Sequence, residues 1–217
     1  MEAAYLRRLE RNLSADEKAR ASRFRFARDR NRFVSARGLL REILALYLNA
    51  SPGRMTIGYG SHGKPFLAGS SLRFNVSHSS DAMLLAIAHR REVGVDVEDG
   101  RNIDAVMDEV GDTVLSEPEK QALARLDGEE ERTNFLLFWT LKESFIKADG
   151  RGVSLPLKRI DVSAPEGRVA VLDGATGEWR TCPRWELRTL EPIPGYAAAL
   201  AAEGRDWRLA LWHWSGE

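Results

Sequence analysis

The stretch around which the rest of this chain is organised is residues 138–152, which read FWTLKESFIKADGRG. At 100° per residue, the apolar side chains of Phe138, Phe145 and Ile146 lie on one side of a helix, with Trp139 at the margin of that side. Glu143 and Lys147 follow Trp139 at intervals of four residues, so the three form a ridge beside the core. Gly150 ends the helix, as a C-terminal glycine does. The periodicity alone also fits an ordinary amphipathic helix in which Glu143 and Lys147 form an ion pair.

A second stretch, residues 93–98, reads VGVDVE and alternates strictly, which predicts a half-buried strand. Its valines point to one face, and Asp96 and Glu98 point to the other. Two carboxylates at this spacing lie roughly 7 Å apart at the backbone. Their oxygens can converge on one hard cation such as Mg²⁺. A solvated strand face would give the same pattern, and Asp-x-Glu is a weak signal by itself.

Together with two upstream stretches, these segments resemble the signature of the 4′-phosphopantetheinyl transferases, in particular the larger, two-repeat surfactin-type class. The four motifs, in the family's order over about residues 30–152, are Gly63-Lys64-Pro65, Phe74-Asn75-Val76-Ser77-His78-Ser79, Gly94-Val95-Asp96-Val97-Glu98 and Trp139-x-x-Lys142-Glu143-Ser144-x-x-Lys147-x-x-Gly150-x-Gly152. The resemblance implies an α+β fold. Two similar α+β halves, with antiparallel sheets and packed helices, would be related by a pseudo-twofold. We expect the halves to be residues 1–91 and residues 92–217. The active site would lie in the cleft between them.

The resemblance also assigns catalytic roles in the second half. Asp96, Glu98 and Glu143 would hold Mg²⁺. Glu143, or a metal-bound water that it orients, would be the general base. Lys147 would neutralise phosphate charge and protonate the departing ADP, and Lys142 would contact phosphate.

The first half would supply the coenzyme A side of the site. Arg20 and Arg32 match best the family's basic residues for the 3′-phosphate, whereas Arg37 is a weaker match. The loop of Lys64 would hold the adenosine end of coenzyme A. Ser77 and His78, expected in a polar loop between strands, would hold the pyrophosphate. Without the resemblance, the arginines fit a solvated helix face, and the lysine and the histidine fit plain surface residues.

Composition sets the limits of this hypothesis. The chain has 217 residues, of which 43% are apolar and 29% charged, as in ordinary globular proteins. Lys plus Arg equals Asp plus Glu at 32 each, so charge gives no hint of a nucleic-acid partner. Cys182 is the single cysteine, which excludes an internal disulfide and a cysteine-based metal site. No apolar run is long enough for a membrane span and no signal peptide is visible, so we expect a cytoplasmic protein without membrane contact.

Local patterns predict the remaining elements. Ser14 to Glu17 and Ser116 to Glu119 are capping boxes, and the helices that they open are expected to end near residues 27 and 126. A further helix is expected at residues 29–48. Residues 1–10 are expected to be helical or disordered, where the family has a strand. The runs at residues 83–88 and 93–98 are expected to pair as a hairpin. Short alternating runs near residues 159–163, 168–172, 184–190, 196–201 and 207–213 predict an antiparallel sheet.

The reaction implied is Mg²⁺-dependent transfer of 4′-phosphopantetheine from coenzyme A to a serine of an apo acyl or peptidyl carrier protein, releasing 3′,5′-ADP. It would serve fatty-acid or secondary-metabolite biosynthesis, and the protein would be a monomer built as a pseudo-dimer. Two alternatives remain at this point. One is a Mg²⁺-dependent nuclease or phosphodiesterase, against which Gly100 stands where such a site needs a lysine. The other is a non-catalytic module that binds carrier proteins or nucleic acid through the arginines of residues 20–41.

Overall fold

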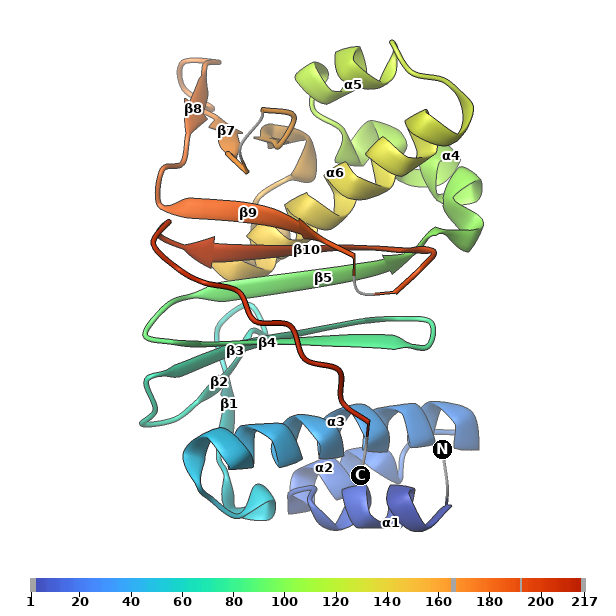
Figure 1. Ribbon diagram of the computed structural model, residues 1–217, viewed down its shortest axis with the longest axis vertical. Coiled ribbons are helices and arrows are strands. Elements are labelled where there is room, and N and C mark those ends of the chain that lie inside the picture. Colours follow the sequence, from blue (N-terminus) through green and yellow to red (C-terminus); the bar gives the residue numbers. More distant parts are fainter. Residues whose placement is uncertain (1–2, 165–166, 192, 216–217) are drawn as a thin grey trace. The chain divides into compact units, whose positions relative to one another are not determined.

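The computed structural model describes residues 3–164, 167–191 and 193–215 of the chain, with the side chains of residues 102 and 153 left aside. Its helices are α1 (Ala3–Arg11), α2 (Ala15–Ala21), α3 (Ala27–Leu48), α4 (Ile103–Val114), α5 (Glu117–Leu123) and α6 (Gly128–Asp149), and short 3-10 turns η1–η4 lie at Pro52–Arg54, Gly100–Asn102, Gly152–Ser154 and Leu157–Arg159 (Figure 1). The strands are β1 (Ile57–Tyr59), β2 (Pro65–Leu67), β3 (Leu72–Ser79), β4 (Ala82–His89), β5 (Val93–Asp99), β6 (Ile160–Asp161), β7 (Ala170–Leu172), β8 (Trp179–Thr181), β9 (Trp185–Leu190) and β10 (Tyr196–Glu203). The fold is therefore α+β, as expected, and all of its described strand pairs within β3 to β10 are antiparallel.

The chain forms two compact units, Met1–Gly58 with Phe66–Ser70, and Tyr59–Pro65 with Ser71–Glu217. These are not the halves expected at residues 1–91 and 92–217, because β3 and β4 pack with β5 in the second unit. The division at residue 91 and the pseudo-twofold between the halves stay predictions.

The first unit is mainly helical. Residues expected to be helical or disordered form α1, whose Leu9 is fully buried with Leu13, Ala21 and Val34. α1 can approach α3 closely because residue 38 is glycine. A Cβ there would lie 2.6 Å from the Leu9 Cβ. The helix predicted to continue from the first capping box to residue 27 ends instead at Ala21, so that α3 begins as a separate helix.

Glu17 connects the capping box of α2 to α3. Its carboxylate accepts the Ser14 amide at 2.9 Å, and also Arg37 Nε at 2.5 Å and Arg41 Nε at 2.6 Å. Burial alone would raise the pKa of Glu17, but Arg41, the Ser14 amide and Arg37 together hold that pKa below its ordinary value. The Arg41 Nη1 also donates to the carbonyls of Pro52 and Met55. The ion pair of Glu17 and Arg41 is therefore a buried structural link between α2, α3 and the turn that follows α3.

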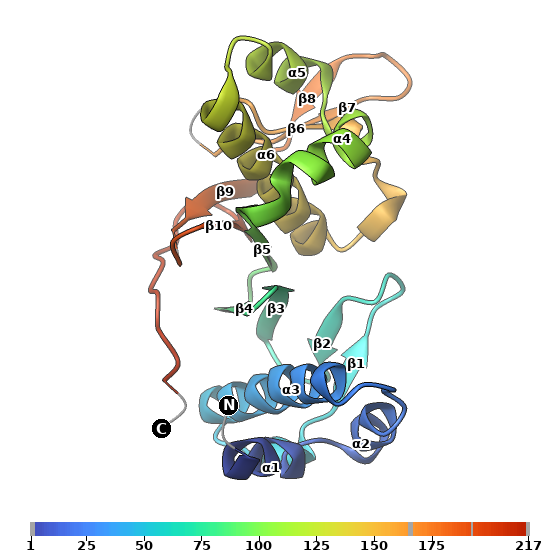
Figure 2. The ribbon, with the colours of Figure 1, turned by 90° about the vertical axis from the view of Figure 1, so that its right-hand side faces the viewer.

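The second unit is built on a hairpin and a three-stranded sheet. β3 pairs with β4, and β5 pairs with β10, which in turn pairs with β9. The hairpin expected between residues 83–88 and 93–98 is therefore wrong. β4 turns back on β3 through Ser80, whose φ is 49°. In Figure 2, α6 lies on one side of the three-stranded sheet, and the C-terminal segment after β10 lies on the other.

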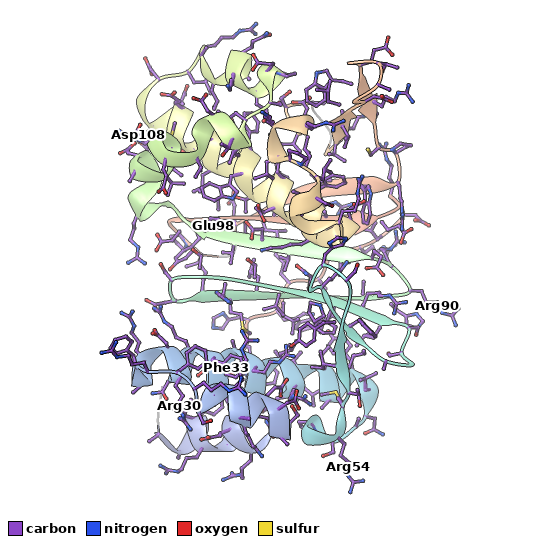
Figure 3. The ribbon with its side chains drawn as sticks, turned by 180° about the vertical axis from the view of Figure 1, so that it is seen from behind. Arg30, Phe33, Arg54, Arg90, Glu98 and Asp108 are labelled. Carbon is purple, nitrogen blue, oxygen red and sulfur yellow. The ribbon has the colours of Figure 1, made fainter. Side chains whose placement is uncertain are left out.

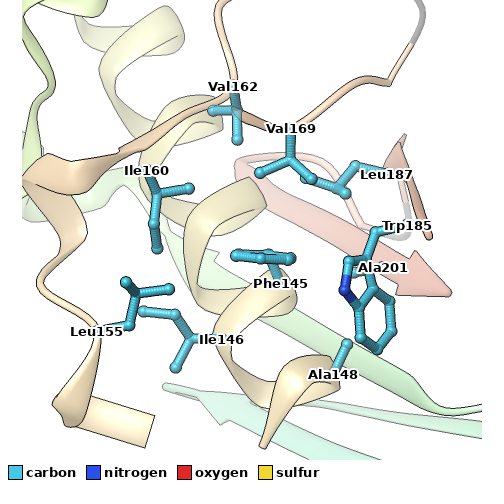
Figure 4. Packing of buried hydrophobic residues seen from close by; sticks show 10 residues of the cluster. All are labelled: Phe145, Ile146, Ala148, Leu155, Ile160, Val162, Val169, Trp185, Leu187 and Ala201. Carbon is cyan, nitrogen blue, oxygen red and sulfur yellow. The ribbon is translucent and has the colours of Figure 1, made fainter. Parts of the chain in front are cut away.

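The core between α6 and this sheet is centred on Phe145, which is 1% exposed. Its ring meets the Trp185 indole edge-on, with centroids 6.0 Å apart and an interplanar angle of 84°. Ile146 and Ala148 of α6, Leu187 of β9 and Ala201 of β10 pack around it (Figure 4). The sequence pattern placed Phe145 and Ile146 on the buried side of this helix, and the structure confirms it.

The run at residues 207–213 forms no strand, contrary to the prediction. β10 is already flanked by β5 and β9, so no edge of it remains for the segment that follows. Trp207 instead packs against the sheet face formed by Val95, Val97 and their neighbours. Its ring lies 3.8 Å below the Arg188 guanidinium, and its Nε1 donates to the Gly204 carbonyl. No helix of the described residues is both long and apolar enough to cross a membrane.

Candidate active site

Gly94 brings the acidic strand against the ridge of α6. A Cβ at this position would lie 2.1 Å from the Ser144 carbonyl oxygen and 2.2 Å from the Ala148 amide nitrogen, which is far inside contact distance. Only glycine therefore allows the backbones of β5 and α6 to touch. Because side chains alternate along a strand, Asp96 and Glu98 share the face of Gly94 and point toward the helix that carries Glu143 and Lys147. The sequence pattern VGVDVE thus sets both the approach of the elements and the direction of the acids.

β3 runs beside β5 in the same direction, yet the two strands share no backbone ladder among the described residues. Side chains at alternate positions of β3 make the connection. Asn75 Oδ1 accepts the Val95 amide at 2.9 Å, and Ser77 Oγ donates to Asp96 Oδ1 at 2.8 Å. We call these side chains, together with Ser79, the β3–β5 seam.

Asp96 lies at the centre of the site and is 1% exposed. Its Oδ1 accepts both Ser77 Oγ and Lys147 Nζ, the latter at 2.5 Å. Lys147 Nζ also donates to Ser77 Oγ at 3.0 Å, which closes a three-membered network. Burial raises the pKa of Asp96 even though Lys147 and Ser77 act to lower it. The strand was predicted to be half-buried, but this face is enclosed and its carboxylate is paired instead.

Glu98 and Glu143 are both close enough to Asp96 for its charge to affect them. Burial raises the pKa of Glu98, and the negative charges of Asp96 and Glu143 raise it further (Glu98 is labelled in Figure 3). Burial and the Asp96 charge likewise raise the pKa of Glu143, against the effect of Lys147. Such mutual shifts require the carboxylates to be near one another. The structure therefore brings together the three acids and the lysine that the sequence singled out.

Two observations bear on whether these residues fit a divalent cation. The Asp96 Oδ2 atom is buried and has no hydrogen-bond partner among the residues that the structure describes, and a cation would supply one. The donors are carboxylate oxygens, which are the ligands of hard cations. Within the described ranges, however, no three acidic, histidine or cysteine side chains are already gathered as a metal-ligand cluster. The donor chemistry fits Mg²⁺, and the three carboxylates would have to move closer to one another to bind it.

Lys142 does not face this site, contrary to the expected phosphate contact. It is fully buried and forms an ion pair with Glu119, which is also fully buried. Its Nζ further donates to the carbonyls of Val114, at 2.6 Å, and Leu157, at 3.2 Å. Because these three partners use every N–H of the ammonium, none is left for a ligand. Lys142 therefore joins α6 to the end of α4, to α5 and to η4.

Lys64 is also engaged by the protein. Its Nζ donates to Glu92 Oε2 and to the Ala148 carbonyl, both at 2.7 Å. Arg73 Nε donates to the other Glu92 oxygen at 2.9 Å. The Ala148 carbonyl is in the last turn of α6, where a cation is favourable. The lysine thus fastens the loop at residues 60–64 to the end of α6, and its role toward a ligand stays a prediction.

His78 is placed differently from the prediction. It lies within β3 rather than in a loop, on the face opposite Ser77, and its side chain is exposed. Among the arginines, the Arg20 guanidinium lies 5.1 Å from the Phe33 ring centroid, and Arg32 is exposed on α3. Arg37 is committed to Glu17. Arg20 and Arg32 belong to the other compact unit, so their part in a ligand site stays a prediction.

Sequence reasoning missed Asn75, Ser79 and Glu92. Asn75 and Ser79 stand two residues on either side of Ser77, so the period of a strand could have found them had β3 been extended to residue 79. Glu92 had no such signal, because its role depends on Lys64 and Arg73 from distant parts of the chain.

Comparisons with known proteins identify the family of this chain. A family model described as "4'-phosphopantetheinyl transferase superfamily" matches residues 92–212, and one described as "4'-phosphopantetheinyl transferase, N-terminal" matches residues 2–90. The chain is 36% identical over 213 residues to the 4′-phosphopantetheinyl transferase HetI of Nostoc, a match covering 96% of this chain and 86% of that protein. This chain belongs to the 4′-phosphopantetheinyl transferase superfamily.

As a member of this superfamily, the chain also matches the transferase Sfp of Bacillus subtilis, at 26% identity over 89% of this chain and 84% of that protein. The predicted surfactin-type class is thereby confirmed. A solved holo-(acyl-carrier-protein) synthase from Bacillus anthracis, in complex with CoA (3′,5′-ADP), aligns with 52% of this chain and 96% of that one at 18% identity. Its TM-score is 0.39, a likeness too distant for the two sites to be compared.

Proposed function

We propose that this transferase moves the 4′-phosphopantetheine group of coenzyme A to a serine hydroxyl of an apo acyl or peptidyl carrier protein, with Mg²⁺, and releases 3′,5′-ADP. The observation that carries the proposal is the buried Asp96, whose Oδ2 has no partner in the described part of the chain, beside two further carboxylates and the Lys147 ammonium. A site that concentrates negative charge away from water needs a cationic ligand. A diphosphate with Mg²⁺ meets that need.

Asp96, Glu98 and Glu143 would hold the metal ion. When bound, Mg²⁺ would offset the charge that develops on the departing phosphate. Positioning and neutralisation of charge dominate phosphoryl transfer, so little covalent chemistry is required of the protein.

Glu143 is the proposed general base. Because the pKa of Glu143 is raised, its carboxylate is a stronger base, which favours uptake of the proton of the attacking serine. Lys147 is 29% exposed and uses two N–H bonds on Asp96 and Ser77. The third can donate to a phosphate oxygen and return a proton to the departing 3′,5′-ADP.

The remainder of coenzyme A would be held by the other motifs. Arg32, with Arg20, would bind the 3′-phosphate, since a guanidinium suits phosphate oxygens. The backbone of the loop that ends at Lys64 would hold the adenosine end, and Ser77 and His78 would contact the pyrophosphate. We include in the proposal a monomeric protein acting in the cytoplasm, which size-exclusion chromatography and fractionation of cells would test.

Mass spectrometry of several purified apo carrier proteins tests the reaction. Each carrier is incubated with the enzyme, coenzyme A and Mg²⁺, and in parallel with EDTA. We expect a mass gain equal to phosphopantetheine on at least one carrier, dependent on Mg²⁺, and its loss in Asp96→Ala and Glu143→Ala. No gain on any carrier from the wild-type protein would refute the transfer. Cleavage of a plasmid in Mg²⁺ would instead favour the alternative of a nuclease.

A further inference from the structure

Ser79 lies at the end of the β3–β5 seam, one strand period beyond Ser77. Its Oγ donates to Glu98 Oε2 at 3.1 Å and accepts the Asp99 amide at 3.1 Å. The hydroxyl is thus bonded to the side chain of one residue of β5 and to the backbone of the next. It therefore fixes its own position and that of the Glu98 carboxylate together.

The arrangement repeats along the two strands. Ser77 of β3 donates to Asp96 of β5. Two residues further along both strands, Ser79 donates to Glu98. Asp96 has a second partner in Lys147, which would keep its orientation if Ser77 were altered. The only hydrogen bond that the structure gives the Glu98 side chain within the described residues is the one from Ser79. The orientation of Glu98 consequently depends on a single hydroxyl.

A carboxylate that must bind a cation gains from a partner that holds one oxygen and leaves the other free. Ser79 meets this condition for Glu98, because it bonds Oε2 only. The burial of Glu98 and its repulsion by Asp96 and Glu143 would otherwise favour rotation of the side chain toward water. The hydroxyl opposes that rotation.

We propose that Ser79 is a positioning residue for divalent-cation binding, which acts by holding Glu98 Oε2 so that Glu98 Oε1 faces the cation shared with Asp96. The inference rests on the proposed function only in placing Mg²⁺ among these carboxylates. In this proposal Ser79 acts through Glu98 and is not itself a ligand of the cation.

The test compares Ser79→Thr with Ser79→Val, which have the same shape and differ by the hydroxyl alone. Ser71→Ala is the control, since Ser71 lies just before β3, and its hydroxyl bonds His89 at 2.6 Å at the far end of the same hairpin. Mn²⁺ binding to the full chain, without coenzyme or carrier, is measured by electron paramagnetic resonance. Outer-sphere partners of metal ligands contribute about 10- to 100-fold to affinity. We expect Ser79→Val to weaken Mn²⁺ by that factor, and Ser79→Thr and Ser71→Ala to bind as the wild type does.

Two further readouts separate positioning from a general loss of structure. Exchange of the Asp99 amide proton should quicken in Ser79→Val but not in Ser79→Thr, because that amide loses its acceptor. In the transfer assay, the Mg²⁺ concentration for half-maximal rate should rise in Ser79→Val while kcat at saturating Mg²⁺ stays near the wild-type value. Should Ser79→Val not fold, Ser79→Ala against Ser79→Thr makes the same comparison.

Equal Mn²⁺ affinity of Ser79→Val and the wild type would overturn the inference, even if the wild type transfers phosphopantetheine. Weakened Mn²⁺ binding in Ser79→Val, restored in Ser79→Thr, would support it even if no carrier were modified. In that second case, the proposed function would fail alone.

Discussion

Substituting Gly94 by alanine should disable the site, because it would move the acidic residues of β5 away from Glu143 of α6. The added Cβ would meet the Ser144 carbonyl oxygen at 2.1 Å and the Ala148 amide nitrogen at 2.2 Å. Since ordinary contact begins near 3.5 Å, the helix must retreat by about 1 Å or more. Both atoms in the way are backbone, so no side chain can move aside. Glu143 would retreat with α6, away from Asp96 on β5.

Two magnitudes follow for Gly94→Ala. Overpacking of a core costs about 1–3 kcal/mol, and we expect the upper end because backbone meets backbone. A misplacement of about 1 Å costs roughly 100-fold in rate. Urea unfolding and the carrier transfer assay measure the two effects. Gly111→Ala is the control, because a Cβ there would lie 3.9 Å from Phe135, and alanine favours the helix.

A Gly94→Ala variant with wild-type activity and unfolding free energy would refute this reasoning. It would mean that β5 and α6 do not touch as described. Loss of stability without loss of transfer in the fraction that remains folded would refute the link between this contact and the site.

Three further predictions concern charges. Glu143→Gln should lower transfer by at least ~100-fold, yet raise the melting temperature of the metal-free protein at pH 8. The pKa of Glu143 is raised in the fold, so this residue contributes stability at low pH that is lost as pH rises through its folded pKa. The increase in melting temperature of Glu143→Gln over the wild type should therefore vanish near pH 4. Lys142→Met should destabilise the protein by about 3–5 kcal/mol by leaving Glu119 charged and buried, and adding Glu119→Gln should recover most of that in urea unfolding. Arg32→Ala should weaken coenzyme A by about 10- to 100-fold and dephospho-coenzyme A hardly at all in titration calorimetry; equal losses would remove Arg32 from the 3′-phosphate.

Sequence patterns predicted the parts of this fold that depend on neighbours along the chain. The periodicity around Phe145 gave the buried side of α6, the two capping boxes gave the starts of α2 and α5, and Gly150 ends α6 with a φ of 81°. The alternation of residues 93–98 gave the common direction of the acids. Each of these signals lies within one turn of helix or one short strand.

The errors share a different cause, because each depends on which distant segment lies alongside. β5 pairs with β10, about a hundred residues later, rather than with β4. The resemblance assigned Lys142 a phosphate contact, and nothing near it in the sequence points to its ion pair with the distant Glu119. His78 was placed in a loop because its polar neighbours resemble loop residues, although Ser77 and its neighbours are polar in order to bridge β3 to β5.

The capping boxes of α2 and α5 have one more property in common. In each, the glutamate at the third position is buried and also binds a cation from a long helix, Arg41 of α3 in one case and Lys142 of α6 in the other. Both long helices have 22 residues and end on a left-handed residue, Asn49 or Gly150. The same local plan, a short capped helix bound through its glutamate to a long helix, therefore occurs at two places in the chain. Replacing the glutamate at either place would therefore remove a helix cap and leave a buried cation unpaired at the same time.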